Sequence, residues 1–190
     1  MDAHTLREAQ DPLKQRYRDD PDAARITLVA DGSLAGAEVT CSVTTGQALA
    51  VATSSAREHT TGADRAEGGG VTEAGLHPGT GGTGSAACSG DMLLQALVAC
   101  AGVTLRAVAT SMGLDVTGAT LHAEGDLDFR GTLGVDKQAP VGFSDIRLRV
   151  DLAAGSALSD DERATLLRLT ERYCVVLQTL RRTPRTSATI

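Results

Sequence analysis

The chain has 190 residues, 42% of them apolar, and a formal net charge of -6. This length suits one domain, and we expect a single domain over residues 1–190. The negative charge and an aromatic content of 2% argue against a nucleic-acid surface, which needs a basic patch or stacking rings. No apolar run approaches the ~20 residues of a membrane span, and the first residues carry no apolar signal segment. We therefore expect a cytoplasmic protein without nucleic-acid or membrane partners.

The first part of the chain predicts a charged arm followed by an antiparallel meander. Residues 1–23 read as a short helix or arm with a turn at Pro21. Alternating or β-branched residues then predict three strands, at 24–30, 37–43 and 48–52. Residues 53–74 have no apolar period and contain a run of glycines, so we expect a flexible surface insertion, with a functional lid as the alternative.

A glycine-rich loop leads into the most apolar helix of the chain. The loop at 79–85 has four glycines but no lysine, so it does not match a phosphate-binding loop, and its glycines are expected to allow unusual backbone dihedrals. Ser89 is the predicted helix cap, and the helix is apolar on nearly every face as far as Met112. Gly113 is the predicted stop. A helix of this kind is expected at the centre of the core.

The remaining chain predicts two strands and a second helix. Residues 119–129 and 142–152 alternate between apolar and polar side chains. Ser159 and Glu162 form a capping box, and an apolar stripe follows at spacings of three and four residues. Residues 187–190 are a candidate closing strand. The whole order predicts an α+β fold, with an antiparallel sheet wrapped on a buried central helix and a second, amphipathic helix.

The cysteines are the residues best suited to chemistry. Cys41, Cys88, Cys100 and Cys174 include no CxxC pair, which gives little support to a zinc site. In a reducing compartment they are not expected to form a structural disulfide framework. The sequence predicts no metal and no bound cofactor.

Two cysteine segments carry a family resemblance. Residues 91–104, with Ala99-Cys100 and Thr104 at their centre, resemble the core helix of the OsmC/Ohr superfamily, which also has a glycine-rich approach. Residues 171–180 around Cys174 resemble the second cysteine segment of that family, and residues 125–131 resemble its middle strand. The resemblance covers roughly residues 24–190 without the 53–74 insertion.

The resemblance implies an OsmC-like fold, an intertwined homodimer and a thiol-dependent peroxidase of organic hydroperoxides. Cys100 would be the peroxidatic nucleophile, Cys174 the resolving thiol, and an external dithiol the reductant. Two alternatives stay open. Cys100 can be a small core residue, because free cysteines are often buried, and the chain can be a binding or structural protein that has kept the fold and lost the activity.

The weak point is the cation that a thiolate at Cys100 would need. Members of the family place an arginine near the thiolate, and neither residues 31–36 nor residues 77–89 contain one. Arg106 is six positions further along the helix and is expected to point away from Cys100. The remaining candidates are Arg25, Arg130 and His77.

Asp91 stands near the position of a family glutamate, as a group to orient the missing cation or as a simple helix N-terminal charge. Cys41 is expected in the core, and Cys88 is either exposed and reactive or has no special role. Val175 follows Cys174 where the family often has proline, so the second helix is expected to continue through this point.

Overall fold

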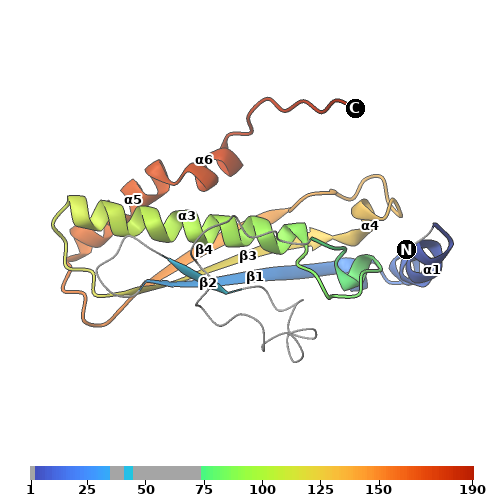
Figure 1. Ribbon diagram of the computed structural model, residues 1–190, viewed down its shortest axis with the longest axis horizontal. Coiled ribbons are helices and arrows are strands. Elements are labelled where there is room, and N and C mark those ends of the chain that lie inside the picture. The colour runs from blue at the N-terminus through green and yellow to red at the C-terminus, as the bar shows by residue number, and fades with distance from the viewer. Residues whose placement is uncertain (1–2, 35–40, 45–73) are drawn as a thin grey trace, which may run out of the picture. The chain divides into compact units, whose positions relative to one another are not determined.

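The computed structural model describes residues 3–34, 41–44 and 74–190. The predicted strand at 48–52, most of the one at 37–43, and residues 53–73 of the predicted insertion lie outside this part of the chain. Figure 1 shows the elements in chain order: α1 (Ala3–Asp19), η1 (Pro21–Ala24), β1 (Arg25–Leu34), β2 (Ser42–Thr44), η3 (Pro78–Thr80), α3 (Ser89–Ser111), β3 (Ala119–Asp128), α4 (Phe129–Thr132), β4 (Asp145–Leu152), α5 (Asp160–Tyr173) and α6 (Val175–Arg181).

The strands form one antiparallel sheet with the order β2-β1-β3-β4. β1 pairs antiparallel with β2. Thr27 hydrogen-bonds to Asp126 and Asp31 to His122, so β1 and β3 run in opposite directions. Together with the helices, this sheet confirms the predicted α+β class.

β4 lies at one edge of the sheet and has an incompletely covered apolar face. Exposed and half-buried residues alternate along the whole strand, as the sequence predicted. Leu148, Val150 and Leu152 share the half-buried face. None of them reaches full burial in the single chain, so this face retains apolar surface for a further contact.

The chain divides into two compact units, and α3, β1, β3 and β4 each contribute one segment to both. The first unit comprises Met1–Val29, Thr45–Leu94 and Glu124–Arg147. The second comprises Ala30–Thr44, Gln95–Ala123 and Leu148–Ile190. The single domain expected from the length stays a prediction.

In the first unit, α1 holds the glycine-rich loop. Tyr17 packs with Ala24 and Phe129 in a small core, and its hydroxyl donates to the carbonyl oxygen of Gly79 at 2.8 Å. Gly81 has a φ of 91°, which confirms the expectation that this loop needs glycine for its backbone.

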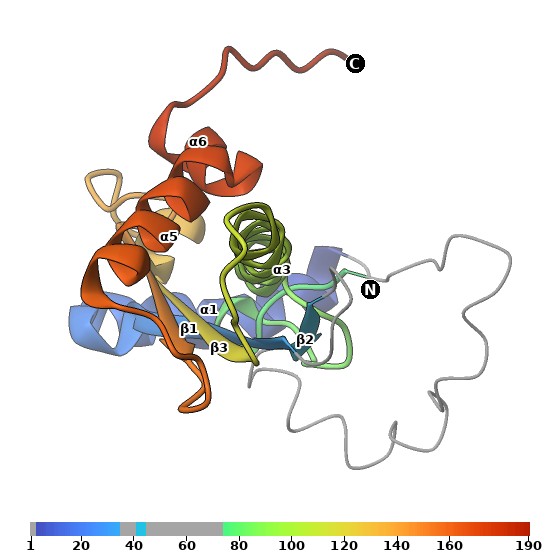
Figure 2. The same cartoon turned by 90° about the vertical axis from the view of Figure 1, so that its left-hand side faces the viewer.

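In the second unit, α3 is the core helix. Leu97, Val98, Ala101 and Leu105 are at most 1% exposed. Figure 2, which looks along α3, shows α5 beside it and strands of the sheet beneath it. Of the helices that the structure describes, α3 alone is long and apolar enough to cross a membrane, but these buried side chains show that it is a core helix. Gly113, with a φ of 67°, follows its end as predicted.

Two local predictions are wrong. Cys88, and not Ser89, occupies the cap position of α3, because the N–H of Asp91 donates to the Cys88 sulfur at 3.4 Å and the N–H of Met92 to the Cys88 carbonyl oxygen at 3.1 Å. Residues 187–190 form no strand, and all four are exposed.

Candidate functional site

Cys100 and Cys174 come together in the second unit. Cys100 lies on α3 and is partly buried, whereas Cys174 follows the last residue of α5 and is 0% exposed. Neither forms a disulfide. The thiol of Cys174 hydrogen-bonds to the Cys100 sulfur, and this bond lowers the pKa of Cys100. The structure therefore places two free thiols side by side, although they are 74 residues apart in the sequence.

The second helix does not continue through Cys174, so that prediction is wrong. Cys174 has an extended backbone, with φ -69° and ψ 107°, and separates α5 from α6. Val175 and Val176 follow it as the first two residues of α6. The break needs no proline, and it buries the Cys174 side chain completely.

The break also supplies the donors that act on Cys100. No side chain caps α6, so its first N–H groups have no partner within the helix. Burial raises the pKa of the Cys100 thiol, but hydrogen bonds from the N–H of Val176, the Cys174 thiol, the N–H of Val175 and the Thr104 hydroxyl outweigh burial. The net pKa is lowered, so Cys100 forms a thiolate more readily than an ordinary cysteine.

Cys174 has the opposite character. Burial, together with the neighbouring Cys100, raises its pKa to about 11, although the N–H of Leu177 opposes the rise. Cys174 therefore stays protonated at neutral pH and donates its hydrogen to Cys100. The two groups form an ordered pair, with the nucleophilic sulfur on α3 and the proton-bearing sulfur at the start of α6.

None of the arginines considered from the sequence lowers the pKa of Cys100. Arg25 and Arg130 form ion pairs with Asp128 in the first unit. Arg106 is buried and donates to the carbonyl oxygen of Val116. Among the described residues, uncharged hydrogen-bond donors produce the shift, and the need for a cation beside Cys100 stays a prediction.

Asp91 lies with Cys88 and His77 in the first unit. It is 1% exposed, and neither carboxylate oxygen has a hydrogen-bond partner of normal geometry among the described residues. Burial raises the pKa of Asp91, while the Cys88 thiol and His77 lower it. Nine residues of α3, about 13 Å of helix, separate Asp91 from Cys100. The role predicted for Asp91, the orientation of a cation beside Cys100, stays a prediction.

Cys88 is buried, and burial is the main cause that raises its pKa. It is therefore not the exposed, reactive thiol that the sequence left open. The described residues contain no group of three or more His, Cys, Asp or Glu side chains placed to hold a metal ion.

The family model of OsmC-like proteins matches residues 82–189, which include both cysteines and α3. The chain belongs to the OsmC-like protein family. An OsmC-like hydroperoxide resistance protein from Jannaschia sp. CCS1 has a similar structure, with a TM-score of 0.54 and 12% sequence identity over 86% of this chain and 91% of that one. No curated protein matches the sequence.

The N–H groups at the start of α6 are the part of this OsmC-like site that sequence reasoning missed. They leave no signal in the sequence, because every residue except proline carries a backbone N–H. At 12% sequence identity, the similar solved structure shows the fold alone.

Proposed function

We propose that this OsmC-like protein is a thiol-dependent peroxidase that reduces organic hydroperoxides through Cys100 and Cys174. The observation that carries the proposal is the pair of adjacent free thiols with opposite pKa shifts. A peroxide is attacked by a thiolate, which Cys100 is placed to form, and the product is resolved by a second thiol, which Cys174 supplies.

The reaction balances with these two residues and one reductant. The Cys100 thiolate attacks the terminal oxygen of the hydroperoxide, the O–O bond breaks, and the alkoxide takes a proton and leaves as an alcohol. Cys100 is then a sulfenic acid. The Cys174 sulfur displaces its hydroxyl as water, and an S–S bond forms. An external dithiol reduces this disulfide by exchange and returns both thiols.

The N–H groups of Val175 and Val176 have a defined part in the first step. They donate to the Cys100 sulfur and so stabilise its negative charge before attack. Because they belong to the backbone, they keep this role with any residue other than proline, which has no N–H group. No bound cofactor enters the scheme, and free thiols suit the reducing cytoplasm, which we infer as the location.

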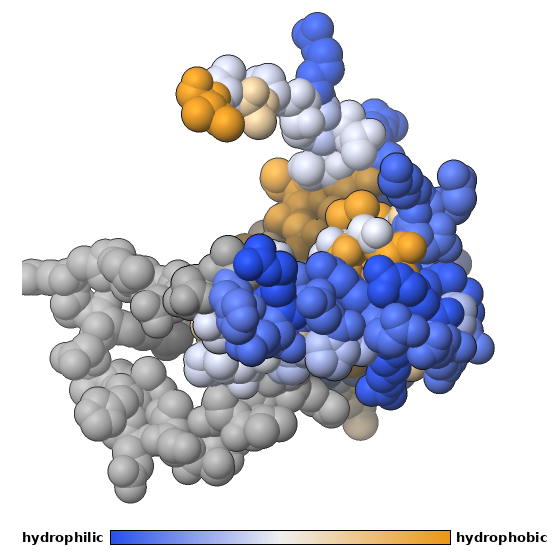
Figure 3. Space-filling view, turned by 90° about the vertical axis from the view of Figure 1, so that its right-hand side faces the viewer, coloured by the Kyte–Doolittle hydropathy of each residue, from blue (hydrophilic) through white to orange (hydrophobic). Residues whose placement is uncertain are grey.

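We infer that a second copy of the chain covers the apolar face next to the site. Leu167, Tyr173 and Val175 are 49%, 59% and 70% exposed. The apolar face of β4 is also only half-buried. Figure 3 shows hydrophobic residues gathered in a patch on the face that it draws. Exposed apolar surface of this kind marks an interaction site, and a homodimer is the assembly that the family resemblance implies.

Sedimentation velocity tests the dimer. Wild type is expected to sediment as a dimer and Leu167→Glu as a monomer, because the substitution places a charge in the contact. Val141→Glu, which changes another exposed apolar residue in the first unit, is the control and should stay dimeric. A monomeric wild type would contradict the assembly.

Thiol titration with cumene hydroperoxide tests the activity. One equivalent added to the reduced protein should remove two thiols rapidly, and Cys100→Ser should abolish this loss. Mass spectrometry of the wild-type product should find a Cys100–Cys174 disulfide. Unchanged thiols in wild type would refute the peroxidase and favour the alternative, an OsmC-like binding or structural protein.

A further inference from the structure

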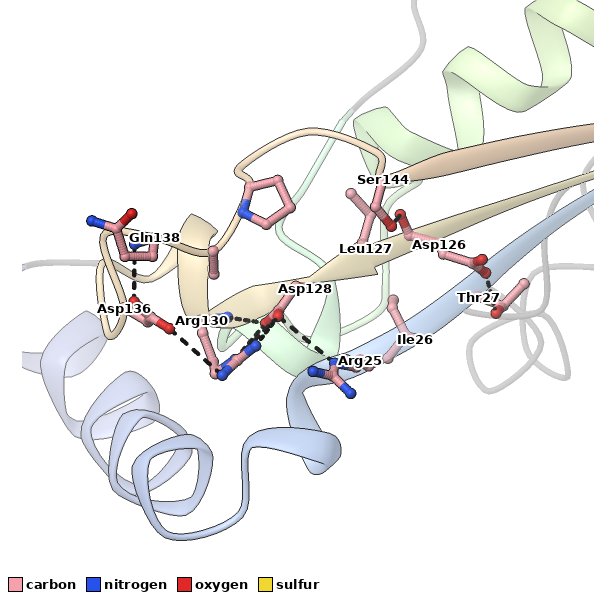
Figure 4. A pocket seen from close by; sticks show the side chains of 12 residues that line it. Arg25, Ile26, Thr27, Asp126, Leu127, Asp128, Arg130, Asp136, Gln138 and Ser144 are labelled. Carbon is pink, nitrogen blue, oxygen red and sulfur yellow. Dashed lines mark hydrogen bonds and ion pairs between the residues drawn. The ribbon is translucent and has the colours of Figure 1, made fainter.

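The first unit contains a second candidate site, a polar pocket that the peroxidase chemistry does not use. It has a volume of about 590 Å³, within the range of small-molecule sites. Figure 4 shows that the pocket is lined by the start of β1, the end of β3 and the chain that follows α4. All its lining residues belong to the first unit.

Charged groups of both signs line one wall of this pocket. Asp128 is 7% exposed and accepts hydrogen bonds from Nε and one terminal nitrogen of Arg130. The other terminal nitrogen of Arg130 is 3.6 Å from Asp136, too far for a hydrogen bond. Nε of Arg25 is 4.0 Å from Asp128, which is also too far. One terminal nitrogen of Arg25 donates to Asp22 at 2.7 Å, so Nε and the other terminal nitrogen of Arg25, together with one terminal nitrogen of Arg130, keep donors for a further partner.

The charge of the lining favours a ligand that carries both signs. Asp126 is neutralised by two hydrogen bonds from Arg147, outside the pocket, which hold its pKa at about 2. The two guanidinium groups then face the carboxylates of Asp128 and Asp136. A simple anion or a simple cation would meet a like charge here, whereas a ligand with separated opposite charges can pair with both.

We propose that this pocket binds a small zwitterion of the amino-acid or short-peptide type. Its carboxylate would lie against Arg25 and Arg130, since guanidinium groups bind carboxylates through paired N–H donors. Its ammonium group would lie against Asp136, and the side-chain amide of Gln138, which has no partner among the described residues, would hydrogen-bond to an amide of the ligand. Ile26, Leu127 and Pro140 provide apolar contact for the ligand backbone.

The inference stands apart from the peroxidase. It uses no cysteine, so Cys100→Ser should bind the same ligand as wild type. Failure of one proposal therefore leaves the other standing.

Isothermal titration with triglycine at low salt tests the pocket. Wild type is expected to bind triglycine roughly tenfold more tightly than N-acetyl-triglycine, which lacks the ammonium group, or triglycine amide, which lacks the carboxylate. No heat of binding with triglycine, or equal affinity for all three peptides, would overturn the proposal.

Two substitutions assign the ends of the ligand. Arg25→Gln should abolish the preference over triglycine amide and keep the preference over N-acetyl-triglycine. Asp136→Asn should do the reverse. The Arg25 side chain is 61% exposed, so the variant should fold and keep the melting temperature of wild type. Arg149→Gln, on β4 outside the pocket, is the control and should leave all three affinities unchanged. Triglycine affinity in Arg25→Gln equal to that of wild type would overturn the assignment.

Discussion

Cys100 and Cys88 show two environments for a cysteine near helix N–H groups. Cys88 receives backbone hydrogen bonds from Asp91 and Gly90, and Cys100 receives them from Val176 and Val175. The pKa of Cys88 is nevertheless raised and that of Cys100 lowered. Helix N–H groups alone therefore do not decide whether a thiol ionises.

The deciding difference is the neighbour. Burial is the largest influence on both thiols and raises both pKa values, but Cys88 also faces the Asp91 carboxyl group, which raises its pKa further. Cys100 instead faces the Cys174 thiol, an uncharged hydrogen-bond donor. A buried carboxyl group keeps a thiol protonated, and a buried thiol helps its neighbour to ionise.

The largest effect is expected from Cys100→Ser, and the matched substitution Cys88→Ser is its control. Cys100→Ser should lower the rate of cumene hydroperoxide consumption roughly thousandfold, because the nucleophile is lost. Cys88→Ser should change it less than about twofold, because a buried protonated thiol is inert. Stopped-flow peroxide consumption measures both rates. Equal losses in the two variants would contradict the assignment of Cys100 as the nucleophile and Cys88 as an inert thiol.

Removal of the resolving thiol should have a smaller effect. Cys174→Ala is expected to lower steady-state turnover with a dithiol roughly tenfold to hundredfold, because the sulfenic acid must then be reduced directly. Dimedone, which labels sulfenic acids, should mark Cys100 in this variant and not in wild type. Absence of the label after peroxide treatment would contradict the assigned order of the two sulfurs.

The pH dependence of alkylation sharpens the contrast. Iodoacetamide should modify Cys100 with a midpoint below that of an ordinary cysteine and Cys88 with a midpoint above it, following their pKa shifts. Asp91→Asn should lower the Cys88 midpoint, because it removes the carboxylate, and leave the Cys100 midpoint unchanged. Peptide mass spectrometry after timed alkylation gives both rates. A Cys100 midpoint that moves in Asp91→Asn would indicate that Asp91 acts on the cysteine pair.

The same substitution has a consequence for stability. The pKa of Asp91 is raised by burial, so the folded protein binds its proton more tightly than the unfolded chain does. Its favourable contribution is present below the unfolded pKa and is lost as pH rises through the folded pKa. Asp91→Asn should therefore be more stable than wild type at pH 7, by roughly 1–2 kcal/mol, and lose this advantage in acid. Urea denaturation at the two pH values measures the difference.

The smallest effect is expected on the solvent-facing side of β3. Arg147 hydrogen-bonds to Asp126 and holds its pKa at about 2. The depressed pKa contributes stability above the unfolded value, which is lost as pH falls through about 2. Arg147→Gln should raise that pKa, move acid unfolding to higher pH, and lower the melting temperature at pH 7 by at most about 2 °C, because exposed ion pairs contribute little.

The long elements could be predicted from the sequence because their signals are local and repeated. The all-apolar run of α3 and the Gly113 stop give its extent to within one residue. The capping box of Ser159 and Glu162 is present as predicted. The alternation of β4 gives its faces. Each signal depends on periodicity or on side chains a few residues apart.

The site could be predicted only in part, because its chemistry depends on backbone groups that meet across the fold. The sequence named both cysteines, but it directed the search for an activating group to arginine side chains. The actual donors are the N–H groups of Val175 and Val176, and a backbone donor leaves no residue type to recognise. The cap at Cys88 was missed for a related reason, since cysteine is not among the usual cap residues.

Gly102, on the core helix, faces Cys41. A methyl group on Gly102 would lie 2.5 Å from the Cys41 sulfur, well inside van der Waals contact. The size of the side chain at either position therefore limits the size that fits at the other. Either residue can therefore change freely only if its partner changes in compensation. Across a set of homologous sequences this pair should covary, with a larger residue at one position accompanied by a smaller one at the other.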